Sequence, residues 1–249
     1  MRINTNLYKN EIQLEFDSFK HQYKYRGQII PSVTTVLGII SKPQLVGWAS
    51  RMCAESIASS WEPGKAYDEL EIQAIIEAGK NSYYQKKIDA GTVGSFLHSF
   101  IEKFIKGENP GMPVNESLQK SVNQFLDWVK EHDVKFLVSE QQIFSKKYQY
   151  TGTLDFICTI DGKMYIGDLK TSNAIYYNSN GEQLMAYRMA REEEFPEEVF
   201  AGCLLIRIGK DGSFEQWIFE DGEVFKRGFL YALKLYETEE EIKRLYPKK

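Results

Sequence analysis

Residues 150–171 read YTGTLDFICTIDGKMYIGDLKT. Two runs rich in β-branched and aromatic residues are joined here by Asp161 and Gly162. An Asp-Gly pair between such runs is a strong local signal for a β-hairpin with a tight turn. If this pair forms the turn, counting back along both strands places Asp155 opposite Asp168. The sequence therefore predicts two carboxylates that face each other across a hairpin.

The predicted opposition of Asp155 and Asp168 is unfavourable by itself, because like charges directly opposite each other on a sheet repel. Lys170 follows Asp168 on the same strand, and alternation places both side chains on one face. Two carboxylates and an amine would thus converge. Hard divalent cations such as Mg²⁺ or Mn²⁺ take oxygen ligands and would turn this repulsion into binding energy. The alternative is an exposed hairpin with scattered charges.

Composition limits the class of protein. The chain has 249 residues, 43% hydrophobic and 27% charged, which is ordinary for a globular protein with a substantial core. No apolar run approaches the roughly 20 residues that span a bilayer, and no signal or transit peptide is evident, so we expect a cytoplasmic protein without membrane contact. The net charge of −4 argues against non-specific coating of nucleic acid but leaves room for a locally basic groove.

The cysteines and the basic clusters allow further expectations. Cys53, Cys158 and Cys203 are odd in number and widely spaced, so we expect reduced packing residues, with no disulfide and no iron–sulfur cluster. Candidate phosphate contacts are the basic residues Lys20, Lys24 and Arg26, the pair Lys86 and Lys87, and the pair Lys146 and Lys147. For each of these clusters the alternative is a solvated face.

Turn signals and hydrophobic periodicity divide the rest of the chain. Expected strands lie within 11–30 and at 136–144, 200–208 and 213–219. Expected helices begin at Val33, Pro43 and Gly91 or span 67–88, 116–130, 178–191 and 221–245. The second half therefore predicts an α/β (α+β) core with a central mixed sheet flanked by helices. We expect residues 1–90 to form an N-terminal strand and helical region and residues 91–249 to form the core.

Two helical pairs add candidate site residues. His98 and Glu102 lie one helical turn apart and share a face, where the imidazole could reach the strand carboxylates. A single helical histidine is more often structural. Gln183 and Tyr187 have the same spacing on the next helix, and their alternative is a surface glutamine with a half-buried tyrosine.

Four motifs follow one another along the chain: Gly94-Ser95-Phe96-Leu97-His98, Gly152-Thr153-Leu154-Asp155, Asp168-Leu169-Lys170-Thr171 and Gln183-Leu184-Met185-Ala186-Tyr187. In this order they resemble those of a known family, the RecB-like branch of the PD-(D/E)XK nuclease superfamily. The N-terminal Pro31-Ser32-Val33-Thr34-Thr35-Val36-Leu37, Lys42-Pro43 and Trp48-Ala49 are similar to phage-type and mitochondrial-genome-maintenance-type exonucleases. Leu154 stands where the superfamily name has proline, a departure usual in this branch. A restriction-endonuclease-like fold is implied.

The resemblance also implies roles for individual residues. His98, Asp155, Asp168 and the backbone carbonyl of Leu169 would bind the metal, and Lys170 would orient or activate the attacking water. Supporting roles or DNA contacts fall to Gln183, Tyr187, Glu140 and Glu102, of which Glu140 matches a less constant acidic position.

The implied activity is a Mg²⁺- or Mn²⁺-dependent DNA exonuclease that leaves 5′-phosphate products. Its expected substrates are single strands or duplex ends in recombination, replication or repair, with possible protein partners from those processes. The N-terminal helices could arch over the site and admit a threaded strand. Three alternatives stay open: an endonuclease on the same core, a non-catalytic DNA-binding scaffold, and a small-molecule metallohydrolase. The retained acidic pair and Lys170 argue against the scaffold, and the lack of several histidine ligands argues against the metallohydrolase.

Overall fold

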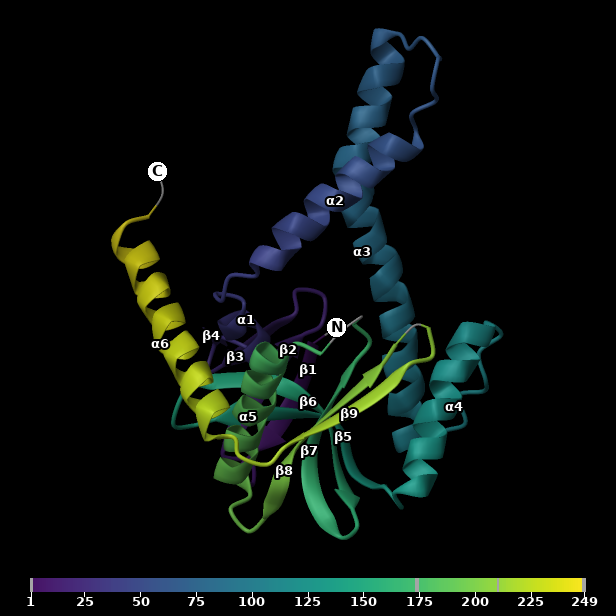
Figure 1. The fold of residues 1–249 in the computed structure, drawn as a ribbon. Coiled ribbons are helices and arrows are strands. Elements are labelled where there is room, and N and C mark those ends of the chain that lie inside the picture. Colours follow the sequence, from purple (N-terminus) through teal and green to yellow (C-terminus); the bar gives the residue numbers. More distant parts are fainter. Residues whose placement is uncertain (1, 173–174, 210, 248–249) are drawn as a thin grey trace. The chain divides into compact units, whose positions relative to one another are not determined.

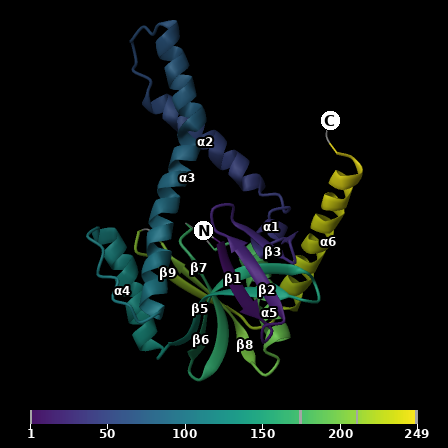
Figure 2. The same ribbon diagram turned by 180° about the vertical axis from the view of Figure 1, so that it is seen from behind.

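The computed structural model describes residues 2–172, 175–209 and 211–247. The chain forms two compact units, one made of Met1–Ile40 with Leu97–Lys249 and the other of Ser41–Phe96. Figure 1 shows the elements of both units in sequence colours, and Figure 2 shows them from behind. None of the helices in the described ranges combines the length and the apolar character that crossing a bilayer requires.

A mixed five-stranded sheet forms the centre of the larger unit. Its strands, in spatial order, are β5 (Lys135–Ser145), β6 (Tyr150–Ile160), β7 (Lys163–Lys170), β8 (Phe200–Ile208) and β9 (Phe214–Phe219). Among the described strands of this sheet, only β7 and β8 pair in parallel, and helix α5 (Tyr177–Glu194) makes the crossover that a parallel pair needs. The predicted mixed α/β class with a mixed sheet is therefore confirmed.

The β6–β7 hairpin has the predicted turn and register. Asp161 and Gly162 have φ values of 50° and 75°, the left-handed pair that a two-residue type I′ turn requires. Ile160 pairs with Lys163 across this turn. The ladder continues to Phe156 and Gly167, so the next position in the same register carries the two aspartates.

Helices α1 (Val33–Leu37), α5 and α6 (Glu223–Leu245) cover the sheet with the main hydrophobic core. Tyr150 is fully buried there, donates a hydrogen bond of 2.7 Å to the carbonyl of Ala186, and packs edge-on against Phe229. Each large side chain buried in this way contributes about 1.5–3 kcal/mol. Burial therefore fixes α5 against the strands that carry the aspartates.

A second layer forms where α4 (Glu116–Glu131) and the end of α3 (Glu69–Ile105) meet β5 and β9. Phe104 and Phe136 both lie within 7 Å of Phe125, at centroid distances of 5.7 and 6.2 Å. Trp128 donates its indole N–H to Gln216 Oε1 at 2.6 Å. This aromatic cluster anchors the part of α3 that belongs to the larger unit.

The first residues form an antiparallel sheet of β1 (Arg2–Leu7), β2 (Ile12–Asp17), β3 (Gln22–Tyr25) and β4 (Gln28–Ile30). Its apolar side chains cluster with Phe144 of β5, and Figure 2 shows this sheet in front of the β5–β6 end. The backbone N–H of Thr151 also donates to the carbonyl of Pro31 at 3.0 Å. The expected strands within 11–30 are confirmed, whereas β1 was not predicted.

The smaller unit is a helical pair. Helix α2 (Pro43–Ser59) packs on the first part of α3, where Ile57 lies so close to Gly79 that a Cβ there would meet it at 2.7 Å. The predicted break at Gly91 is wrong, because α3 runs without interruption from Glu69 to Ile105. A glycine inside a helix costs only about 1 kcal/mol, and no proline accompanies it to force a break.

Candidate active site

The carboxylate of Asp168 is the most buried group of the predicted site, with 1% of its side chain exposed. Its Oδ1 accepts a hydrogen bond of 3.0 Å from Gln183 Nε2. Its Oδ2 forms an ion pair with Lys170, whose Nζ lies 2.6 Å away. A buried carboxylate is costly unless it is paired, so Lys170 and Gln183 together stabilise the carboxylate of Asp168.

Asp155 lies beside this carboxylate and has a different set of partners. Its Oδ2 accepts a hydrogen bond of 2.7 Å from the backbone N–H of Leu169 and lies 4.0 Å from His98 Nδ1. Burial, followed by the charge of Asp168, raises the pKa of Asp155 well above its ordinary value, although Lys170 acts in the opposite direction. The two aspartates thus repel each other as their predicted opposition implies.

Lys170 stabilises the pair of aspartates. Burial alone would lower its pKa, but the charges of Asp168 and Asp155 outweigh that effect, so the pKa is raised. Its Nζ also donates to Gln183 Oε1 at 3.2 Å. Lys170 is therefore a protonated ammonium at neutral pH and a donor, not a base.

Helix α5 supplies the side chains above this strand pair. Gln183 Nε2 is 3.0 Å from the hydroxyl oxygen of Tyr187, and the same amide contacts both Asp168 and Lys170. Tyr187 is buried, with 4% exposure, and its ring fills the space where a Cβ on Gly152 would lie. Gln183 thus connects α5 to both charged groups of β7, and the alternative of a half-buried tyrosine does not hold.

His98 enters the site from the end of α3. Burial lowers its pKa, Lys170 lowers it further, and the charge of Asp168 and a hydrogen bond to the Leu169 backbone oppose this. Because the net shift is downward, the imidazole is neutral at neutral pH and keeps a nitrogen lone pair. A neutral imidazole is the form that ligates metals.

Glu102 and Glu140 border a small cavity of about 10 Å³ that His98, Asp155 and Leu169 also line. This volume holds about one water-sized sphere. Desolvation, followed by the charge of Glu102, raises the pKa of Glu140 to about 7, although part of its side chain stays exposed. Glu140 also has a left-handed φ of 49°, a conformation that costs energy in a residue other than glycine and is common at functional sites.

One contact of the site was missed by sequence reasoning. The hydroxyl of Tyr23, on β3, lies 2.9 Å from Thr153 Oγ1, two residues before Asp155 on β6. Tyr23 is 3% exposed, so this hydrogen bond is shielded from water. No local pattern indicates the contact, because it joins segments that are distant in sequence.

The donor set suits a hard divalent cation, since it offers carboxylate oxygens, the Leu169 backbone and a neutral imidazole. The neighbouring carboxylates of Asp155 and Asp168 support that fit, because the charge of Asp168 raises the pKa of Asp155 and a cation would relieve this repulsion. In the described ranges, however, no group of three or more His, Cys, Asp or Glu side chains is already spaced around one ion. Instead, Lys170 and Gln183 contact the carboxylate of Asp168 directly.

Comparison with known proteins does not identify a family. No family model matches the chain, and no curated protein matches it. Among solved structures, one match is titled "Crystal structure of SSO0001" and covers 77% of this chain and 86% of that chain. It is 13% identical with a TM-score of 0.31, a likeness too weak to carry an argument.

Proposed function

We propose that this protein is a metal-dependent DNA exonuclease of the RecB-like branch of the PD-(D/E)XK superfamily. One observation carries the proposal: the buried carboxylate of Asp168 contacts both Lys170 and Gln183, with Asp155 beside it. These residues come from different motifs of the resemblance, and the tertiary structure brings them into one network. A scattered surface hairpin would not produce this network.

The finer fold assignment belongs to the same proposal. A restriction-endonuclease-like core is supported by the β6–β7 hairpin, the α5 crossover and the parallel β7–β8 pair. In this arrangement the acidic residues lie on adjacent strands, and the crossover helix returns over them with Gln183 and Tyr187. Residues from successive motifs of the sequence then surround one site.

Asp155, Asp168, His98 and the carbonyl of Leu169 would hold Mg²⁺ or Mn²⁺. When bound, such an ion supplies a water of lowered pKa and stabilises negative charge on the phosphate. Hydrolysis adds a water oxygen to phosphorus and releases the 3′ oxygen of the neighbouring nucleotide, which leaves the 5′-phosphate that the resemblance implies. Glu140 and Glu102, which line the small cavity beside Asp155, would support the site or contact the DNA.

Lys170 has a role that its pKa defines. Because its charge is retained at neutral pH, it would donate hydrogen bonds to the attacking water or to a phosphate oxygen and stabilise the charge that develops. Gln183 accepts from the ammonium through Oε1 and donates to Asp168 through Nε2, so it holds both groups in one orientation. Tyr187 in turn fixes the amide of Gln183.

The proposed substrate is single-stranded DNA or a duplex end in recombination, replication or repair. The test is cleavage of end-labelled single-stranded, duplex and closed circular DNA with Mg²⁺, Mn²⁺ or EDTA. The variants are Asp168→Asn and Lys170→Ala, and the matched control is Asp161→Asn in the turn of the same hairpin. We expect metal-dependent loss of linear DNA, abolished in the two site variants and unchanged in the control.

Other outcomes would change the assignment. Nicking of the closed circle would indicate an endonuclease on the same site. Metal-independent DNA binding without cleavage under any condition would indicate a scaffold. Equal cleavage by Asp168→Asn and the unaltered protein would place any activity elsewhere and refute the proposed site.

A further inference from the structure

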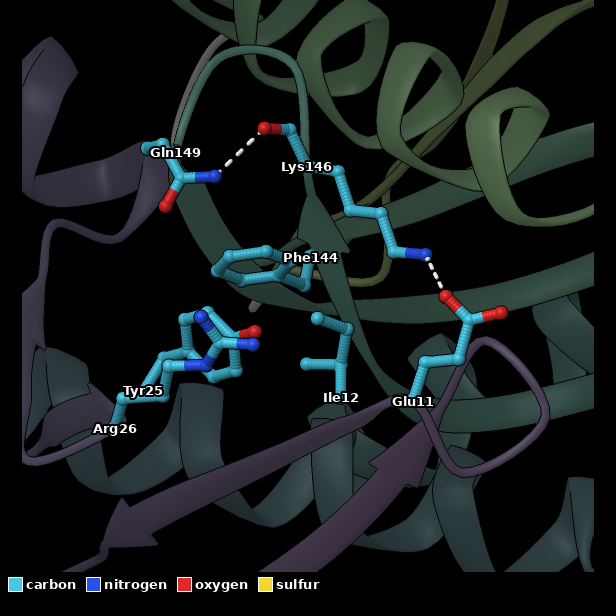
Figure 3. A pocket seen from close by; sticks show the side chains of 7 residues that line it. All are labelled: Glu11, Ile12, Tyr25, Arg26, Phe144, Lys146 and Gln149. Carbon is cyan, nitrogen blue, oxygen red and sulfur yellow. Dashed lines mark hydrogen bonds and ion pairs between the residues drawn. The ribbon is translucent and has the colours of Figure 1, made fainter.

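A second cavity lies where the N-terminal sheet meets the end of β5. It has a volume of about 430 Å³ and is lined by Arg26, Lys146, Gln149, Tyr25, Phe144 and Glu11, among others (Figure 3). We propose that this cavity binds a backbone phosphate of the nucleic-acid strand that the candidate active site takes. The inference rests on the proposed function for the identity of that strand.

The cavity has an excess positive charge and a free cation. Lys146 is paired with Glu11 at 2.6 Å, so these two charges offset each other. Arg26 lies over the ring of Tyr25 at 5.0 Å and has no ion pair with an acidic side chain in the described part of the chain. Its guanidinium is therefore the group left to bind an anion, and its planar donors match the oxygens of a phosphate.

The backbone conformation at Arg26 also favours a role for this side chain in binding. Arg26 and Gly27 have φ values of 50° and 76° and connect the paired residues Tyr25 and Gln28, which makes a two-residue turn of the left-handed type. Asn, Asp or Gly is favoured at the first position of such a turn. A long side chain there costs stability, and such costs concentrate at functional positions.

The remaining lining suits the sugar and base of a nucleotide. Phe144 and Ile12 are buried and form an apolar floor, and Figure 3 shows Tyr25 beside this floor and Arg26 close to Tyr25. Gln149 uses its amide N–H on the Lys146 carbonyl, which leaves its amide oxygen for another donor. Flat apolar surface next to a cation is typical of sites for single-stranded nucleic acid.

The cavity also lies within reach of the candidate active site along β5. Phe144 belongs to the same strand as Glu140, and the segment between them spans about 13 Å at the usual rise of a strand. Tyr23, on the strand before the Arg26 turn, contacts Thr153, which lies two residues before Asp155 on β6. A single-stranded nucleic acid a few nucleotides long can therefore occupy the cavity and the candidate active site together.

The test is the affinity for a fluorescent single-stranded oligonucleotide, measured by anisotropy in EDTA over a range of salt. Arg26→Asn introduces a residue that the turn prefers, so a thermal melt should show a folded protein that is at least as stable. We expect Kd to rise about tenfold and the salt slope to fall by about 0.7. Lys163→Asn, next to the other left-handed turn, removes the same charge and should change Kd less than twofold.

Two competition arms distinguish the source of the phosphate. Inorganic phosphate and a nucleoside monophosphate are titrated against both proteins and followed by NMR shifts of the N-terminal sheet. Weak binding of both, together with the Arg26-dependent oligonucleotide affinity, supports a strand phosphate. Tight Arg26-dependent binding of the mononucleotide, with unchanged oligonucleotide affinity, would overturn the proposal in favour of a free nucleotide. Equal affinity of Arg26→Asn and the unaltered protein would overturn it entirely.

The active-site variant separates this inference from the proposed function. Asp168→Asn should bind the oligonucleotide with unchanged Arg26 dependence, although it cannot cleave it. If the unaltered protein cleaves nothing but still binds through Arg26, the nuclease assignment fails and the phosphate site stands. If cleavage occurs and Arg26 makes no difference to affinity, the reverse holds.

Discussion

Two hairpins of this protein have the same turn geometry and different chemistry. The β6–β7 turn has Asp161 and Gly162, and the β3–β4 turn has Arg26 and Gly27, all with left-handed φ values. The first turn uses residues that the geometry prefers, and its strands carry the buried Asp168 and the partly buried Asp155. The second has a cation where the geometry favours a short polar residue, and that cation lines a cavity. The same turn geometry is therefore built from residues that suit it in one hairpin and from a residue that it disfavours in the other, where we propose that a phosphate binds.

The largest expected effect is the loss of activity when an aspartate on the strands of the first hairpin is replaced. Asp168→Asn should lower kcat/KM for DNA cleavage by at least about 100-fold to 1000-fold, because it removes the buried negative charge that faces Lys170. Asp161→Asn changes the same residue type in the turn and should leave activity and stability unchanged. Initial rates with Mg²⁺ measure both, and equal losses in the two variants would show that the effect is structural.

The next effect tests the packing behind the first hairpin. A Cβ on Gly167 would lie 1.9 Å from the ring of Phe156, so Gly167→Ala should lower the free energy of unfolding by about 1–3 kcal/mol. Gly47→Ala, where no atom lies within 4 Å of the new carbon, should stabilise α2 slightly. Urea unfolding measures both, and a neutral Gly167→Ala would show that the ring moves aside without cost.

A swap between the two turns tests the comparison directly. Arg26→Asn should raise the free energy of unfolding by about 0.5–1 kcal/mol, and Asp161→Arg should lower it by about 1 kcal/mol. The reason is the same in both cases, since a long side chain in the left-handed region is disfavoured. Urea unfolding at one pH is the measurement. Destabilisation by Arg26→Asn would mean that Arg26 serves the fold and would remove the strain argument for a ligand.

The smallest effect is a pH dependence next to the aspartates. The pKa of Glu140 is raised to about 7 in the folded protein, so the folded state holds its proton more tightly than the unfolded state. Its stabilising contribution is complete below pH 4.5 and is lost as the pH rises through 7. Metal-free Glu140→Gln should show a smaller fall in stability over this window. Parallel pH profiles of the two proteins would contradict the raised pKa.

Local signals allowed much of the first hairpin and its helix to be predicted. The Asp-Gly turn fixed one register, because alternation of side chains makes any other register bury the wrong face. The strand at 200–208 has the predicted bounds, since a continuous apolar run between turn signals leaves little choice. The proximity of Gln183 to Asp168 was not visible in the spacing alone. It depends on how α5 crosses the sheet.

Weak local signals account for the differences. Strand β1 reads RINTNL, which is too polar to show the alternation of apolar and polar residues that predicts a strand. It forms because β2 supplies the partner backbone. The unbroken helix α3 follows from the small cost of a single glycine, Gly91, inside a helix. Strand β1 thus depends on a partner that its own sequence does not specify, whereas α3 continues because one glycine is too weak a signal to end a helix.

By itself, the sequence determined the mixed α/β class, the hairpin register and the side chains that share a face, because these depend on residues close in the chain. Only the tertiary structure decided that Tyr23 contacts Thr153, that Gln183 contacts both Asp168 and Lys170, and that Arg26 and Lys146 line one cavity. Arg26 and Lys146 belong to separate basic clusters of the sequence. Such contacts join segments far apart in sequence, and they form because apolar packing brings the N-terminal sheet onto Phe144 of β5 and brings α5 onto the central sheet.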